Sequence, residues 1–325
     1  MLDQPDPIPA PDPGPPPPGP TDNLATSPPS GMVGRIMYQG EVPSNEFLAI
    51  HLFLTLPDGS NTKSLFDAAD PHSYTGPSWS SSGDRLAVAT NLQEQAEWDI
   101  YIMNSDGSGL THTIQGPSSG DFAPSWSPDG SKIVFQSTTD AVKGFDIYIY
   151  DVDSGDISNL TDSEGIDELP SWHPDGSKVI FQTTTSSGTN IYQINPDGTD
   201  RIALTNDVRT QNSAAVFSPD GQLIAFESTK HQSDQAGLIL GDFEIYTMNA
   251  DGTDPKRITF GVGDDDQARF PTWSPDGRHI AFEFHDNTIT VFFAVTSIAV
   301  MNADGSNIYL LPDQPVDGRY PRWGP

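Results

Sequence analysis

One short phrase recurs along the chain and constrains its fold more than any other feature. In its fullest form it reads Pro-x-Trp-Ser-Pro-Asp-Gly. Copies, some of them incomplete, stand at residues 77–80, 124–130, 170–176, 216–221, 271–277 and 321–325. Their aromatic residues lie 45 to 56 residues apart, a period typical of β-propeller blades with four strands each. The chain is therefore expected to be a repeat protein.

Each copy combines a turn with a strand. In Ser-Pro-Asp-Gly, serine suits the first position of a type I turn, proline presets φ at the second, and glycine suits the fourth. Apolar segments typical of strands follow, as at residues 132–136 and 223–227. A variable loop, a third strand and a second turn come next. The second turns stand at residues 58–59, 106–107, 153–155, 197–198, 251–252 and 304–305. Six such turns predict six blades.

The two ends of the chain are expected to complete one blade together. Residues 35–39 match a second strand with no first strand before it, and Trp323 lies in a final first strand with nothing after it. Joining them closes the ring and removes exposed strand edges. The predicted fold is all-β: a six-bladed propeller of four-stranded blades over residues 31–325. An extended proline-rich tail is predicted at residues 1–30.

The repeated phrase, together with Asp-Ile-Tyr and Asn-Ala-Asp-Gly, resembles the repeat of TolB-type propellers over residues 31–325. The resemblance implies a propeller whose relatives mostly bind proteins, sugars or metals, some of them fused to hydrolase domains. The sequence departs from TolB itself in placing a proline-rich tail, and not a separate α/β domain, before the repeats. Fold alone does not give function.

Composition excludes several classes of partner and chemistry. The net charge is −30, from 45 acidic and 15 basic residues, so nucleic acid and anionic lipid are poor partners. Cations, cationic proteins or a salty medium suit such a surface better, although solubility alone could also explain it. Without cysteine there is no disulfide, thiolate zinc site or cysteine nucleophile. No apolar stretch is long enough for membrane insertion.

The variable loops are the predicted binding face. If the strands of a blade run from inner to outer, both stereotyped turns share one face of the disc and the variable loops share the other. Loops on a rigid scaffold usually carry function. The candidate binding residues on this face are His72, Asp121, Asp167, Glu168, Asp264, Asp265, Asp266, Arg269, Asp317 and Arg319.

Calcium is a candidate cofactor at Asp264, Asp265 and Asp266. Calcium takes six to eight oxygen ligands, which a ring of carboxylates could supply. No loop has the spacing of a known calcium motif, and aspartates commonly cap their own loop turns. Both interpretations stay open for these residues.

Two long insertions on the same face suggest an interface. One includes Leu238, Ile239 and Leu240, and the other includes Phe292 and Phe293. Apolar side chains in neighbouring long loops could form an exposed patch of the kind that marks interfaces. Alternatively, the second insertion simply extends its blade as a longer hairpin.

The sequence offers little sign of catalysis. A Gly-x-Ser-x-Gly match at residues 116–120 lies in a loop, without the strand-to-helix turn that a nucleophile elbow needs. The repeat tryptophans are predicted core residues. We therefore expect a non-enzymatic binding or assembly module. The alternative is a metal-dependent surface enzyme or binding protein that acts on polysaccharide through the acidic channel face.

The tail predicts how such a module could assemble. Its prolines, including the run Pro15, Pro16, Pro17 and Pro18, favour an extended polyproline II path. Such a segment can be a spacer after an export signal, or it can hold a neighbouring copy. Head-to-tail contact of that kind makes an open filament unless it closes into a ring. Other copies of the chain or a surface protein are the expected partners, in an extracellular, cell-surface or periplasmic location.

Overall fold

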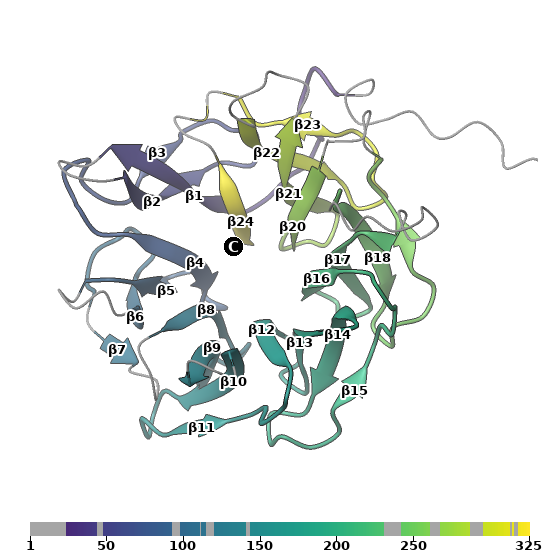
Figure 1. Cartoon of the computed structure of the whole chain (residues 1–325). Coiled ribbons are helices and arrows are strands. Elements are labelled where there is room, and N and C mark those ends of the chain that lie inside the picture. Colours follow the sequence, from purple (N-terminus) through teal and green to yellow (C-terminus); the bar gives the residue numbers. More distant parts are fainter. Residues whose placement is uncertain are drawn as a thin grey trace, which may run out of the picture.

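A computed structural model shows six antiparallel sheets arranged around a central channel (Figure 1). It describes residues 24–43, 48–92, 98–110, 112–114, 120–140, 144–230, 242–260, 267–286, 295–312, 314 and 318–325. Each sheet has four strands, so the prediction of six four-stranded blades is confirmed. Within these residues, no helix is long and apolar enough to cross a membrane.

The blades follow one another in chain order, with the innermost strand first. Blade 1 consists of β24 (Arg319–Gly324), β1 (Arg35–Pro43), β2 (Leu48–Thr55) and β3 (Lys63–Ser64). Blade 2 consists of β4 (Tyr74–Trp79), β5 (Arg85–Thr90), β6 (Asp99–Asn104) and β7 (His112–Ile114). Blade 3 consists of β8 (Asp121–Trp126), β9 (Lys132–Asp140), β10 (Gly144–Asp151) and β11 (Ile157–Asn159).

The remaining blades repeat the same order. Blade 4 consists of β12 (Ile166–Trp172), β13 (Val179–Thr185), β14 (Gly188–Ile194) and β15 (Ile202–Ala203). Blade 5 consists of β16 (Asn212–Phe217), β17 (Leu223–Ser228), β18 (Glu244–Asn249) and β19 (Lys256–Arg257). Blade 6 consists of β20 (Gln267–Trp273), β21 (His279–Asp286), β22 (Val295–Asn302) and β23 (Tyr309–Leu310).

The core lies between the blades. Six buried apolar clusters each join side chains of two neighbouring blades. Between blades 4 and 5, for example, Ile180 and Ile191 pack against Phe217 and Phe226. The middle strands are therefore covered on both sides, which explains why their sequences are nearly continuous apolar runs.

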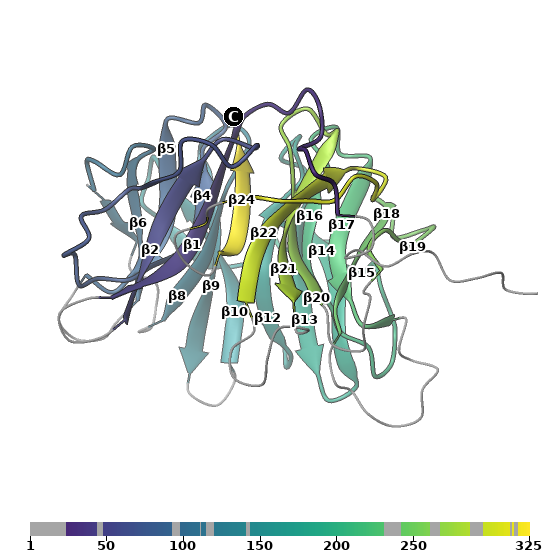
Figure 2. The same ribbon diagram turned by 90° about the horizontal axis from the view of Figure 1, so that it is seen from above.

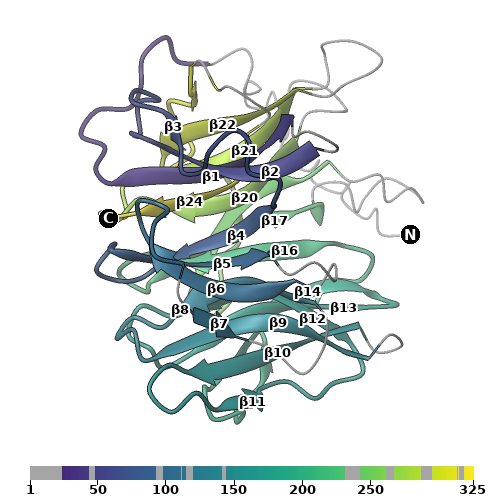
Figure 3. The same cartoon turned by 90° about the vertical axis from the view of Figure 1, so that its left-hand side faces the viewer.

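The two chain ends close the ring as predicted. Ile36 in β1 pairs with Trp323 in β24, and Figure 3 shows these two strands side by side. The Trp323 indole Nε1 donates a hydrogen bond to the Val33 carbonyl at 2.7 Å. Arg35 Nε donates to the Pro325 carbonyl at 3.2 Å. The C-terminal strand is thus held both in its sheet and by its flanking residues.

The segment just before β1 packs onto blade 6. The Ala25 amide donates to the Ile308 carbonyl at 2.7 Å. Leu24 packs against the core cluster shared by blades 5 and 6, and Met32 packs against the one shared by blades 6 and 1. Residues 24–34 therefore form a strap on the propeller, although residues up to 30 were expected to belong to the tail. Residues 1–23 lie outside the described part of the chain.

Candidate functional site

A cavity of about 320 Å³ occupies one end of the central channel. All six inner strands contribute to its wall. The aromatic side chains of the wall come from equivalent repeat positions: Trp79, Trp126, Trp172, Phe217, Trp273 and Trp323. Prolines of the repeat turns and the C-terminal residue surround its opening: Pro128, Pro174, Pro219, Pro275 and Pro325. The cavity therefore opens on the face of the Ser-Pro-Asp-Gly turns, where the C-terminus lies (Figure 2).

The repeat tryptophans connect the blades as well as line the cavity. Trp172 Nε1 donates to the Ser125 carbonyl at 3.1 Å, and Trp273 Nε1 donates to the Val216 carbonyl at 3.4 Å. In both cases the acceptor lies one residue before the aromatic residue of the preceding blade. Trp126, Trp172, Trp273 and Trp323 are only 5–8% exposed. Their role as core residues is confirmed, and only the edges of their rings are left to face the cavity.

Arg322 is the exception in an otherwise uniform ring. The five other residues at its repeat position are short: Ser78, Ser125, Ser171, Val216 and Thr272. Two of them accept hydrogen bonds from the next blade, as in the contact of the Trp126 amide with Ser78 Oγ at 3.1 Å. Arg322 instead places a long cationic side chain in the cavity wall, and its Nη1 donates to the Pro321 carbonyl at 3.0 Å.

The surroundings of Arg322 disfavour its positive charge. Burial lowers the pKa of Arg322, but a guanidinium stays protonated at neutral pH. Among the residues that the structure describes, no carboxylate forms an ion pair with it. Arg201 and Arg269, by contrast, pair with the buried Asp167 and Glu227. Within the described part of the chain, Arg322 is thus a cation without a carboxylate partner, in a cavity whose wall combines aromatic rings, prolines and hydroxyl side chains.

A second ring of contacts explains the bends in the inner strands. Each inner strand contains one residue with a φ between 49° and 59°: Gly76, Ala123, Leu169, Ala214, Phe270 and Tyr320. Five of the six backbone amides donate to a glutamine or glutamate of the preceding blade. The acceptors are Gln39, Gln136, Gln182, Glu227 and Glu283. These side chains support a backbone conformation that most L residues avoid.

A periodic feature of the sequence accompanies this ring of contacts. An apolar run that ends in Gln or Glu recurs in the second strand of five blades, as in Ile133 to Gln136 and Ile224 to Glu227. In blade 2 the equivalent residue is Ala89, whose side chain has no acceptor to offer the Ala123 amide. The signal is periodic, but the partner lies on the next blade, which the sequence does not reveal.

Several predicted binding residues are built into the blades. Asp121 and Asp167 begin inner strands and have no exposed surface. Asp167 accepts from Thr183 Oγ1 at 2.7 Å and from Arg201 Nη2 at 3.1 Å. Glu168 accepts from Gln182 Nε2 at 3.2 Å, and burial raises its pKa. The structure brings these groups to the predicted end of the channel, but Asp121 and Asp167 do not face solvent.

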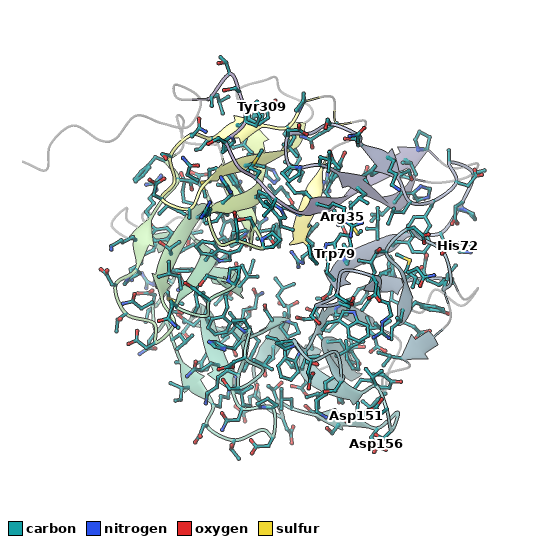
Figure 4. The ribbon with its side chains drawn as sticks, turned by 180° about the vertical axis from the view of Figure 1, so that it is seen from behind. Arg35, His72, Trp79, Asp151, Asp156 and Tyr309 are labelled. Carbon is teal, nitrogen blue, oxygen red and sulfur yellow. The ribbon has the colours of Figure 1, made fainter. Side chains whose placement is uncertain are left out.

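Other predicted residues are only partly brought together. Arg269 pairs with Glu227 at 2.9 Å and stacks over Phe243, with 4.2 Å between the guanidinium carbon and the ring centre. Arg319, on the neighbouring inner strand, approaches Glu41 at 3.7 Å. His72 pairs with Asp70 at 2.7 Å between blades 1 and 2, and Figure 4 shows it far from the channel beside which Arg35 and Trp79 lie.

The remaining candidates lie outside the described residues. They are the calcium candidates Asp264, Asp265 and Asp266, then Asp317, the interface candidates Leu238, Ile239, Leu240, Phe292 and Phe293, and the prolines Pro15, Pro16, Pro17 and Pro18. Within the described part of the chain, no group of three or more metal-ligating side chains could hold a metal ion.

Comparison with known proteins identifies the family. The sequence matches the TolB beta propeller domain over residues 33–325. The chain belongs to the TolB β-propeller family. TolB from Acinetobacter baumannii is similar in structure, with 22% identity and a TM-score of 0.71 over 92% of this chain and 68% of that one. The resemblance to TolB-type propellers that the repeat indicated is therefore confirmed.

Two further structures show how widely this TolB-like fold is shared. Putative TolB from Agrobacterium tumefaciens has 19% identity and a TM-score of 0.64, over 89% of this chain and 92% of that one. Oligogalacturonate lyase from Vibrio parahaemolyticus has 13% identity and a TM-score of 0.53, over 85% of this chain and 79% of that one. No curated protein matches the sequence. At these identities the likeness shows the fold alone.

Proposed function

We propose that this TolB-like propeller is an exported, non-enzymatic assembly module. In its sharper form, it is an extracellular filament subunit joined to other copies through its N-terminal tail. TolB-like propellers typically bind proteins. The described residues supply a closed ring with a cavity on its axis, and Arg322 stands in the cavity wall with no carboxylate paired to it among these residues. Such a site suits the binding of a protein segment better than bond-breaking chemistry.

The observation that carries the proposal is the firm attachment of the tail's root. Residues 24–34 are tied to blade 6 through the Ala25–Ile308 hydrogen bond and the packing of Leu24 and Met32. A polyproline II path for the preceding 23 residues would span about 70 Å, at about 3.1 Å per residue. A stiff arm on a fixed base can hold neighbouring subunits in a defined orientation, which a freely hinged linker does not do. Export to an extracellular, cell-surface or periplasmic location belongs to the same proposal.

Electron microscopy of the purified protein tests this function. The full chain should form filaments or defined oligomers, and a variant that lacks residues 1–23 should give single discs. Residues 24–34 must be kept, because Leu24 and Met32 belong to the packed structure. A second variant, with residues 1–23 replaced by a Gly/Ser segment of equal length, controls for the mere presence of a tail. Single discs for the full chain at all concentrations would refute the proposal.

A further inference from the structure

The cavity wall departs from its own repeat at one point, and that point suggests a ligand. If this ring had only a structural role, a short residue would be expected before the aromatic residue in all six blades. Five blades have one. Blade 1 supplies Arg322. Because the equivalent residues Ser78 and Thr272 accept bonds from the next blade, the arginine also gives up a structural contact. Because Arg322 does not serve the packing of the blades, we look for its role in binding a ligand.

The charge of Arg322 calls for a carboxylate from outside the propeller. Three other arginines of the described residues pair with buried carboxylates of the propeller, as Arg257 does with Glu244 at 2.6 Å. Among the residues that the structure describes, the acceptor for the Arg322 guanidinium is a backbone carbonyl. In a chain of net charge −30, an acidic ligand is repelled by most of the surface and is attracted where such a cation stands.

The shape and chemistry of the wall call for a proline-rich backbone. Proline rings and tryptophan side chains line the cavity and offer apolar contact, and the serine and threonine hydroxyls between them can hydrogen-bond a peptide backbone. A polyproline II segment has few internal degrees of freedom to lose, so it binds apolar, aromatic-lined surfaces at low entropic cost. The ligand predicted by the cavity is therefore a proline-rich segment with at least one carboxylate.

The N-terminal segment of this chain has this chemistry. Residues 1–23 are rich in proline, contain Asp3, Asp6, Asp12 and Asp22, and include no lysine or arginine. Its root at Ala25 is fixed beside Ile308, at the outer strand of blade 6, whereas the cavity lies on the propeller axis. An arm that starts at the rim of one disc is placed to reach the axis of the next.

We propose that the cavity around Arg322 receives residues 1–23 of a neighbouring copy, with an aspartate of that segment paired to the Arg322 guanidinium. This inference rests on the proposed function, since it names the receptor for the polymerising arm. One subunit supplies the arm and the next supplies the cavity, which makes the contact head-to-tail and, unless it closes into a ring, open-ended.

A peptide of residues 1–23 tests the receptor directly. The peptide has no aromatic residue, so tryptophan fluorescence reports only on the propeller, five of whose tryptophans line the cavity. Titration into the propeller that lacks residues 1–23 should give saturable binding. Binding should weaken by about tenfold or more for Arg322→Ser, because the ion pair forms in a partly desolvated site. Serine occupies this position in three other blades, so the variant should fold.

Two controls separate the ion pair from general charge effects. Arg278→Ser removes the same charge from an exposed position on the same face, outside the cavity, and should change affinity less than about twofold. A peptide with its four aspartates replaced by asparagine should bind the unaltered propeller as weakly as the native peptide binds Arg322→Ser. Equal affinity of the native peptide for Arg322→Ser, Arg278→Ser and the unaltered propeller would overturn the inference.

Failure of this inference can be told apart from failure of the proposed function. If the full chain carrying Arg322→Ser still forms filaments, the arm binds elsewhere and only the receptor assignment is wrong. If the peptide binds through Arg322 but the full chain never assembles, the neighbouring copy is the wrong occupant and the assembly role falls with it. Filaments that are lost on Arg322→Ser and kept on Arg278→Ser support both.

Discussion

Glu227 should be one of the most sensitive positions in the propeller. Its carboxylate is 1% exposed and joins three strands of two blades. Oε1 accepts from Ser213 Oγ at 2.7 Å and from Arg269 Nη2 at 2.9 Å, and Oε2 accepts from the Phe270 amide at 2.9 Å. Replacement by alanine removes all three contacts and breaks the connection between β17 and the inner strand of the next blade.

The cost of Glu227→Ala can be estimated from these contacts. An unsatisfied buried amide such as that of Phe270 costs about 1–3 kcal/mol. Loss of one partner from a fully buried ion pair costs about 3–5 kcal/mol. The Arg269 side chain is 27% exposed, so water replaces part of the lost interaction and we reduce this share to about 1–2 kcal/mol. The free energy of unfolding should fall by about 2–5 kcal/mol, and Tm by roughly 4–10 °C.

Glu227→Gln is the matched control, because glutamine occupies the equivalent position in three other blades. Glutamine keeps an oxygen for the Phe270 amide and loses only the charge that pairs with Arg269, so it should cost about 1 kcal/mol. Denaturant unfolding followed by tryptophan fluorescence, with thermal unfolding followed by circular dichroism, measures both variants. If alanine and glutamine differ by less than about 0.5 kcal/mol, the amide contact across the blades does not carry the stability that we assign to it.

Two further predictions concern the seam of the ring and acid stability. A Cβ at Gly324 would lie 2.5 Å from the Trp79 indole, so Gly324→Ala should lower the free energy of unfolding by about 2–3 kcal/mol. Gly130→Ala is the control: only its positive φ is strained, so it should cost about 1 kcal/mol. Equal shifts in Tm for the two variants would contradict this prediction. Hydrogen bonds from neighbouring side chains lower the pKa of Asp151 and Asp175 from 3.8 to about 2. A carboxyl group whose pKa is lowered by folding contributes stability that is complete above about pH 4 and is lost as the pH falls towards 2. Tm should therefore drop between about pH 4 and pH 2. An unchanged Tm over this range would count against these turns as a source of stability.

The architecture was predictable because its signals are local. A Ser-Pro-Asp-Gly turn is specified within a few residues: Ser127 Oγ donates to Asp129 at 2.6 Å, and the Ser131 amide donates to the same carboxylate at 3.0 Å. Repetition of such a turn sets the number of blades. The closure between β1 and β24 was also predictable, since each end of the chain lacked what the other end supplied.

The polar contacts of the candidate site were not predictable in the same way. Asp167 was expected to face the channel, and its burial depends on Arg201, which lies 34 residues away. The amides of Leu169 and Phe270 find their acceptors on the preceding blade, so the residue that supports the bend is remote in sequence. Left-handed φ at a leucine or a phenylalanine carries no signature of its own in the sequence. Contacts between repeats need the structure, because the repeat phrase describes one blade at a time.

Departures from the repeat are more informative about function than the repeat itself. Five blades place a short residue before the aromatic position, and in two of them its hydroxyl accepts a hydrogen bond from the neighbouring blade. The sixth carries Arg322 there, in the blade that both chain ends build. The strap that fixes the proline-rich arm joins β1 of this same blade, and Trp323 donates to Val33 in it. If the proposal holds, the closing blade supplies the receptor, and the strap that continues from its β1 onto blade 6 supplies the root of the acidic arm, so residues that complete one ring would also link it to the next.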